Sequence, residues 1–124
     1  MIVLDTSVWI EYLRSNESYF ARVSKLLEMG EVLAIDCVFG ELLQGAKSKR
    51  EQTIIKSYYA YLPKSDRCDF VEAGLYANEN RLIDKGVGLI DTAILLTAIK
   101  HNAQLWTLDK KLLSVLPPEN CYQP

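Results

Sequence analysis

Residues 1–5 read Met-Ile-Val-Leu-Asp, and this short stretch decides the class of fold. Four apolar residues in a row are typical of a parallel strand that is buried on both faces. The run ends at an aspartate, and residues 6–13 then carry apolar side chains at helical spacing. A buried strand followed directly by a helix is the repeating unit of an α/β fold.

The rest of the chain repeats this unit. Short strands are expected over residues 32–35 and 104–108, a brief strand at 67–68 and an edge strand at 121–122. Helices are expected over residues 18–29, 38–46, 51–62, 70–84, 92–100 and 110–116. This alternation requires crossover connections, so we expect a three-layer α/β/α sandwich with a mostly parallel central sheet. No linker or repeat interrupts residues 1–124, which we expect to form one domain.

Composition excludes several classes of protein. The chain has 124 residues, 49% of them hydrophobic, which is enough for one core. Its net charge of −2 does not fit a protein that holds nucleic acid by overall positive charge. The most apolar stretch, residues 87–99, is interrupted by Asp91 and is too short to cross a membrane. We see no export signal at the N-terminus and expect a cytoplasmic protein.

Cysteine and histidine are too sparse for most catalytic or metal centres. Cys37, Cys68 and Cys121 are odd in number and widely spaced, without a CxxC pair, so we expect neither a disulfide scaffold nor a zinc site. The single histidine, His101, leaves little room for a Ser–His–Asp triad. If the protein is an enzyme, carboxylates must carry its chemistry.

Four carboxylates are placed where an α/β sheet binds ligands. Asp5 and Asp109 each follow a predicted strand, and ligands of such sheets bind at the carboxyl ends of the strands. Asp91 stands at the entrance of an apolar helix, and Glu41 is the one acid in an apolar segment. Gathering four acids is costly unless a cation neutralises them, and oxygen ligands suit Mg²⁺ or Mn²⁺.

Each of these acids also has a simpler interpretation. Asp5 could cap the helix that follows it, and Asp91 could interact with a helix dipole. Glu41 could be a solvated helix residue, and Asp109 could be an ordinary turn residue before two lysines. Asp36, which also ends a predicted strand, is expected to be a cap or a supporting residue. The residues alone leave both interpretations open.

Four short motifs occur in a characteristic order. Residues 5–10 read Asp-Thr-Ser-Val-Trp-Ile, and residues 41–46 read Glu-Leu-Leu-Gln-Gly-Ala. Residues 91–98 read Asp-Thr-Ala-Ile-Leu-Leu-Thr-Ala, and residues 107–112 read Thr-Leu-Asp-Lys-Lys-Leu. Together they resemble PIN-domain ribonucleases, in particular the VapC-type toxins of bacterial toxin–antitoxin pairs. The resemblance covers essentially the whole chain. One departure is Lys111, where the family often carries a further acid and thus a possible ligand for a second metal.

The resemblance implies a metal-dependent endoribonuclease with a PIN-like fold. Asp5 and Asp91 would be the principal ligands of Mg²⁺ or Mn²⁺, and Asp109 would bind directly or through water. Glu41 would complete the shell or orient the attacking water. Thr6 or Ser7 could hydrogen-bond a ligand carboxylate or the phosphate, although helix capping explains at least one of them equally well. The alternative is a catalytically silent PIN-like module that binds RNA or protein.

The same resemblance implies an RNA substrate, a VapB-like antitoxin and a homodimer. When the four acids are set aside, twelve acidic residues remain against fourteen basic ones, a net charge of +2 outside the site. Candidates for contacting an RNA backbone are Lys47, Lys49, Arg50 and Lys110, each of which could equally belong to a solvated face. Aromatic residues could stack on bases, but core packing or a dimer contact is the favoured interpretation for Tyr58, Tyr59, Tyr61, Trp9 and Trp106.

Overall fold

A parallel sheet forms the centre of the computed structural model, which describes residues 1–124. Strands β1 (Ile2–Leu4) and β2 (Gln104–Trp106) pair in parallel, with Val3 opposite Leu105. Isolated parallel bridges extend the sheet on both sides: Ile2 to Val32, Ala34 to Lys64 and Leu105 to Cys121. The expected strands at residues 1–4 and 104–108 are confirmed over Ile2–Leu4 and Gln104–Trp106, and those at 32–35 and 121–122 only as isolated bridges at Val32, Ala34 and Cys121.

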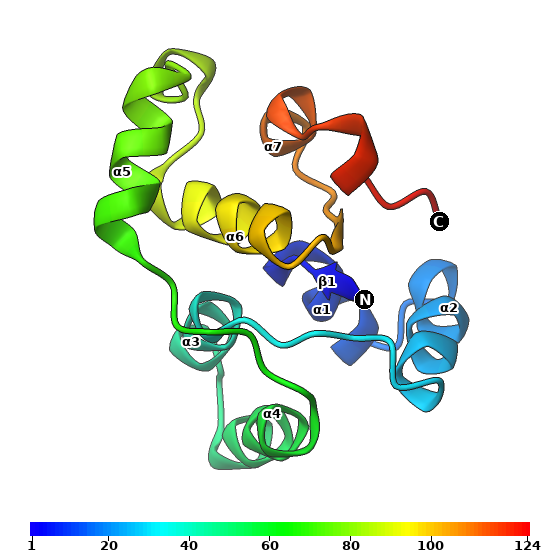
Figure 1. The fold of residues 1–124 in the computed structure, drawn as a ribbon. Coiled ribbons are helices and arrows are strands. Elements are labelled where there is room, and N and C mark those ends of the chain that lie inside the picture. The colour runs from blue at the N-terminus through cyan, green and yellow to red at the C-terminus, as the bar shows by residue number, and fades with distance from the viewer.

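Seven α-helices surround this sheet (Figure 1). They are α1 (Thr6–Leu13), α2 (Glu17–Glu28), α3 (Asp36–Gln44), α4 (Lys49–Tyr61), α5 (Phe70–Glu79), α6 (Leu89–Lys100) and α7 (Lys110–Val115), with short 3₁₀ turns η1 (Ile83–Lys85) and η2 (Pro118–Asn120). Helix α5 packs along α6, α3 pairs with α4, and α1 contacts both α2 and α3. The expected α/β class with a parallel sheet is confirmed. None of the helices combines the length and apolarity needed to cross a membrane.

Side-chain caps fix where several helices begin. The Asn16 side chain accepts a hydrogen bond from the backbone N–H of Ser18 at the start of α2. Ser48 caps α4 by accepting from the Glu51 N–H, while the Glu51 carboxylate accepts from the Lys47 N–H. This exchange is close to a capping box and satisfies two donors that the helix itself leaves free. It ties the chain between α3 and α4 into a defined turn.

The core explains the most apolar elements. All three residues of β1 are buried, as the uninterrupted apolar run predicts. Helix α6 is buried on most of its circumference, which is why its sequence lacks an amphipathic pattern. Trp9 and Trp106 are 2% and 4% exposed, so they are core residues, and the hydroxyl of Tyr58 bonds that of Tyr12 at 2.7 Å. Tyr61 is 80% exposed.

Several elements differ from expectation, three of them by more than two residues or by their absence. The strand expected at residues 67–68 is wrong, because the residue that bridges to Ala34 is Lys64. The helix expected over residues 70–84 ends at Glu79, because Arg81 adopts the left-handed region (φ 54°) and stops it. Helix α6 begins at Leu89 rather than at residue 92, so Asp91 lies inside its first turn.

Candidate active site

Asp91 is half-buried, and its side chain accepts no hydrogen bond in the structure. It is the third residue of α6, whose N-cap is Gly88, so its side chain does not cap the helix. Its pKa is raised to about 6, first by burial and then by the charges of Asp5, Asp109 and Glu41. The folded chain therefore brings all four sequence-predicted acids into one electrostatic cluster, which we call the acid cluster.

Asp5 is held by two hydroxyl groups. It occupies the N-cap position of α1 and is 5% exposed, yet its side chain makes no cap hydrogen bond. Its Oδ2 accepts hydrogen bonds from Ser7 Oγ (2.9 Å) and Thr107 Oγ1 (2.7 Å). These hydroxyls in turn accept backbone N–H groups of Leu108 and Asp109, both at 3.1 Å. Both hydroxyls use Oδ2, so Oδ1 is the oxygen that stays available to a ligand.

Glu41 is tied to a different helix from its own. It lies on α3, and its Oε1 accepts a 2.6 Å hydrogen bond from Thr6 Oγ1 at the start of α1. The carboxylate is half-buried, so the interpretation as a freely solvated helix residue is wrong. Of the two interpretations left open for Thr6 and Ser7, the structure shows the bond to a carboxylate and not the helix cap, since both hydroxyls donate to carboxylates.

Asp109 combines two roles. Its Oδ1 caps α7 by accepting the backbone N–H groups of Lys111 (2.9 Å) and Leu112 (3.4 Å). The expectation of a turn residue is thus correct for this oxygen. Oδ2 accepts no hydrogen bond, so it is the oxygen of Asp109 that remains free for a ligand.

No cation of the chain neutralises the acid cluster. The two ion pairs of the structure, Arg14–Glu11 and Lys100–Glu72, do not include any of its members. Lys111 instead lies beside Gly86, where an added Cβ would come within 2.9 Å of the lysine Cδ. Four carboxylates without a counter-charge fit a hard divalent cation, whose preferred ligands are oxygens.

Thr107 contributes to the site although its sequence position does not predict this role. Thr107 is 4% exposed, donates to Asp5 and accepts from the Asp109 backbone, so it links two members of the acid cluster. The signal was present as the Thr-Leu-Asp sequence at residues 107–109, but nothing in that pattern shows which carboxylate the hydroxyl binds.

A groove of about 420 Å³ adjoins the acid cluster between α1, α3 and α4. Glu41 is part of its wall, and six of its eleven lining residues are hydrophobic. The lining residues are Ile10, Leu13, Arg14, Glu41, Leu42, Gly45, Ala46, Lys47, Glu51, Ile54 and Ile55. Of the four candidate RNA contacts, Lys47 lines this groove, Lys49 and Arg50 begin α4, and Lys110 begins α7 next to Asp109; all are exposed.

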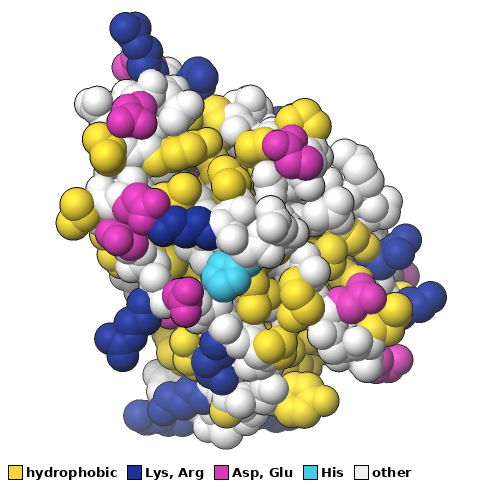
Figure 2. All heavy atoms as spheres, viewed as in Figure 1, with side chains coloured by type: hydrophobic (Ala, Val, Ile, Leu, Met, Phe, Trp, Pro, Cys, Tyr) yellow, Lys and Arg dark blue, Asp and Glu magenta, His cyan; other side chains and the backbone are white.

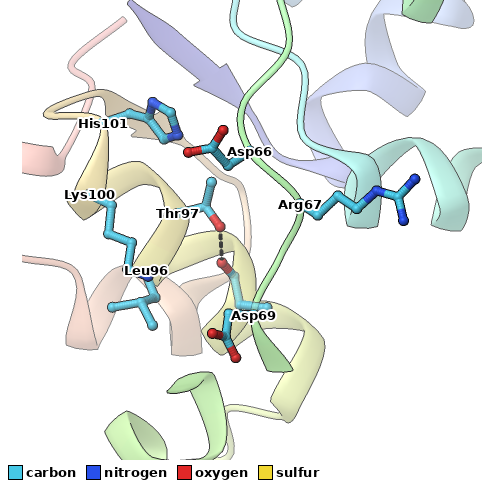
Figure 3. Close-up of a pocket in the computed structure, with 8 residues that line it drawn as sticks. Asp66, Arg67, Asp69, Leu96, Thr97, Lys100 and His101 are labelled. Atoms are coloured by element: carbon cyan, nitrogen blue, oxygen red, sulfur yellow. Dashed lines mark hydrogen bonds between the residues drawn. The ribbon is translucent and has the colours of Figure 1, made fainter. Parts of the chain in front are cut away.

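A second pocket of about 130 Å³ contains none of the four acids. Figure 3 shows its lining: Asp66 faces His101, and the Thr97 hydroxyl donates to the Ala93 carbonyl at 2.7 Å. On this face of the molecule, acidic and basic side chains alternate around the histidine rather than forming one charged field (Figure 2). The pocket therefore does not share the chemistry of the acid cluster.

All three cysteines are free thiols, but two of them lie in contact with each other, which their spacing does not predict. Cys37 and Cys68 bring their sulfur atoms to 2.6 Å, and Asp36 lies beside both. Sequence spacing could not show this, because 31 residues separate the two cysteines.

Comparison with known proteins identifies the family to which the chain belongs. The profile of the PIN domain matches residues 2–115. The chain belongs to the PIN-domain family. It is 34% identical to Ribonuclease VapC32 of Mycobacterium tuberculosis over 113 residues. This alignment covers 90% of this chain and 87% of that protein. It is 31% identical over 112 residues to Ribonuclease VapC11 of the same species, covering 85% and 84% of the two chains.

Solved structures share the fold. The crystal structure of VapBC2 from Rickettsia felis, bound to a DNA fragment from its promoter, superposes with a TM-score of 0.69 at 24% identity. That superposition covers 98% of this chain and 96% of the other. FitAcB from Neisseria gonorrhoeae gives a TM-score of 0.62 at 21% identity, covering 92% and 91%.

Proposed function

We propose that this chain, as one PIN domain over residues 1–124, is a divalent-metal-dependent endoribonuclease toxin that a cognate antitoxin neutralises. The observation that carries the proposal is Asp91, whose pKa is raised to about 6 by burial and by three further acids with no cation among them. The ribonuclease names of relatives with 34% and 31% identity supply the substrate class.

Within the acid cluster, three acids are assigned to metal binding and one to orienting water. Asp5, through Oδ1, and Asp91 would be the principal ligands of Mg²⁺ or Mn²⁺, and Asp109 would contribute through Oδ2. When bound, the ion would lower the pKa of the attacking water and polarise the phosphate. Glu41 orients the attacking water with Oε2, because Thr6 occupies its other oxygen. Ser7 and Thr107 keep Asp5 oriented by binding Oδ2.

Basic side chains position the RNA by contacting its phosphates. We place this reaction, and the protein, in the cytoplasm. Lys47 lines the same groove as Glu41, and Lys110 directly follows Asp109 in the chain. Lys49 and Arg50 extend this basic surface along α4. Phosphate contacts of this kind orient a strand without reading its bases.

The groove between α1, α3 and α4 suits the antitoxin. Its apolar walls would receive apolar side chains, and the adjoining carboxylates would receive an arginine or lysine of the same segment. In the complex, hydrogen–deuterium exchange is expected to slow in α1, α3 and α4. Protection confined to α5 would contradict this placement.

A homodimer is the expected assembly. Apolar side chains are strongly exposed on one end of the molecule, including Val71 (87%), Leu75 (59%) and Ile83 (82%) on α5 and η1. Clusters of this kind commonly mark an interface. Light scattering should give twice the chain mass of 14.1 kDa, and Val71→Asp should reduce it to one chain.

Cleavage of labelled RNA by the purified protein tests the activity. Cleavage should occur with Mn²⁺ or Mg²⁺, stop with EDTA and return when the ion is restored. Undiminished cutting in EDTA would overturn the metal-dependent mechanism. RNA binding without cutting under every ion condition would favour the alternative of a silent PIN-like binding module, against which the complete acid cluster argues.

A further inference from the structure

Cys37 and Cys68 face each other outside the acid cluster. Cys37 is the second residue of α3, and Cys68 lies in the segment between α4 and α5. Their Sγ atoms are 2.6 Å apart, close to the covalent S–S length of about 2.05 Å. Both residues are half-buried, and neither is a member of the acid cluster.

Asp36 holds the two cysteines in this arrangement. Its Oδ1 accepts the backbone N–H of Cys37 (2.7 Å), and its Oδ2 accepts the backbone N–H of Cys68 (3.4 Å). One carboxylate therefore holds the backbones of both residues near each other. The arrangement is specific to the folded chain, because the residues are 31 positions apart.

We propose that Cys37 and Cys68 are a dithiol pair that small disulfides of the glutathione class oxidise to an intrachain disulfide. One cysteine loses its proton and attacks the oxidant, which releases one small thiolate and leaves a mixed disulfide. The second cysteine loses its proton and attacks the protein sulfur, forming the Cys37–Cys68 bond and releasing the second thiolate. The two protons pass to these thiolates, so two protein thiols are oxidised while one small disulfide is reduced to two thiols.

The surroundings set the rate of this reaction. Burial, the neighbouring thiol and Asp36 raise the pKa of Cys37, and burial with Asp36 raises that of Cys68. Since the thiolate is the attacking form, the first step is slow at neutral pH and accelerates as pH rises. Cys68 Sγ lies 3.7 Å from Thr97 Oγ1, and Thr97 also lines the pocket in Figure 3.

The cross-link would act on the helix that carries Glu41. It closes the chain between residues 37 and 68, which includes α3 and α4, and ties the start of α3 to the segment leading into α5. Closing a loop of about 30 residues restricts the unfolded chain, so oxidation should raise the melting temperature by about 5–10 °C.

Peptide mapping after oxidation tests the proposal directly. The full chain, reduced and then freed of reductant, is equilibrated with oxidised glutathione at pH 8, blocked with an alkylating reagent and digested with trypsin. The three cysteines fall in separate tryptic peptides, residues 26–47, 68–81 and 112–124. We expect peptide 26–47 joined to peptide 68–81, one alkylated cysteine at Cys121, and at least a tenfold higher yield than in denaturant.

Variants separate the pair from general thiol chemistry. Cys37→Ser and Cys68→Ser should each abolish the cross-link and the rise in melting temperature, whereas Cys121→Ser should keep both. Asp36→Asn should lower the yield of the Cys37–Cys68 cross-link. Asp66→Asn, which changes an exposed acid in the segment that carries Cys68, should leave that yield unchanged. Three alkylated cysteines, separate glutathione adducts or a link to Cys121 would overturn the proposal. So would thiols that react only after a chelator removes bound zinc, because the cluster would then be a metal site.

Discussion

The Thr6 hydroxyl donates a 2.6 Å hydrogen bond to Glu41 across 35 residues of sequence. This contact joins the first residue of α1 to the middle of α3. It means that the position of one carboxylate of the acid cluster depends on a hydroxyl from another helix. Interactions of this kind, one step removed from the reacting groups, are typically worth 10- to 100-fold in affinity or rate.

Replacing Thr6 by valine removes the hydroxyl and keeps the shape. We expect RNA cleavage to fall about tenfold, because Glu41 loses the bond that orients it. Thr6→Ser should retain most activity. Thr53→Val is the control, since that exposed hydroxyl bonds only a backbone carbonyl of α4. Equal activity of Thr6→Val and the control would show that the contact does not matter for cleavage.

Thr107 provides a test of how Asp5 is held. Thr107→Val removes the hydroxyl that donates to Asp5 Oδ2 and accepts from the Asp109 backbone. Calorimetric titration with Mn²⁺ should show about 10- to 100-fold weaker binding. Thr107→Ser should bind nearly as tightly as the unmodified protein. An unchanged dissociation constant in Thr107→Val would exclude a role of this hydroxyl in organising the metal ligands.

The raised pKa of Asp91 predicts how the metal-free protein responds to pH. In the unfolded chain this carboxyl ionises near its ordinary pKa of 3.8, and in the folded protein near 6. The folded state therefore holds a proton that the unfolded state has lost, and Asp91 makes folding less favourable as pH rises from about 4 to 6. After discounting for solvent screening of a half-exposed group, this cost is about 1–2 kcal/mol at neutral pH.

Asp91→Asn isolates that cost. Chemical denaturation in EDTA should show the variant to be more stable than the unmodified protein at pH 7, with the difference disappearing near pH 4. A difference that is constant from pH 4 to 7 would mean that Asp91 is not the titrating group. Mn²⁺ affinity of the unmodified protein should also weaken below pH 6, because protons then compete for the same carboxylate.

The local sequence predicted the elements well where a single physical cause dominates. The apolar run at residues 2–4 predicts a buried strand, and the helix expected over residues 51–62 is found two residues longer at its start, as α4 from Lys49. The bridge at Lys64 was missed because it forms through one residue of a polar segment, which leaves no apolar pattern. The early end of α5 was missed because apolar spacing continues past Arg81.

The sequence points to the members of the candidate site but not to the hydrogen bonds that hold them in place. Strand ends and family motifs point to the four acids, yet only the fold shows that Thr6 binds Glu41 while Ser7 and Thr107 share Asp5 Oδ2. The contact between Cys37 and Cys68 was not predicted, because their separation in sequence says nothing about tertiary proximity. Contacts between distant residues depend on packing, which local patterns do not encode.

The Mn²⁺-dependent shift in melting temperature of the unmodified protein and of Asp91→Asn tests the central claim most directly. At about 100 times the dissociation constant, a ligand stabilises the folded state by about 2.7 kcal/mol, equivalent to a shift on the order of 10 °C. We predict this shift for the unmodified protein and for Asp84→Asn, an exposed acid outside the acid cluster, and less than half of it for Asp91→Asn. Equal shifts in all three proteins would contradict the account, because Asp91 would then not help to bind the metal.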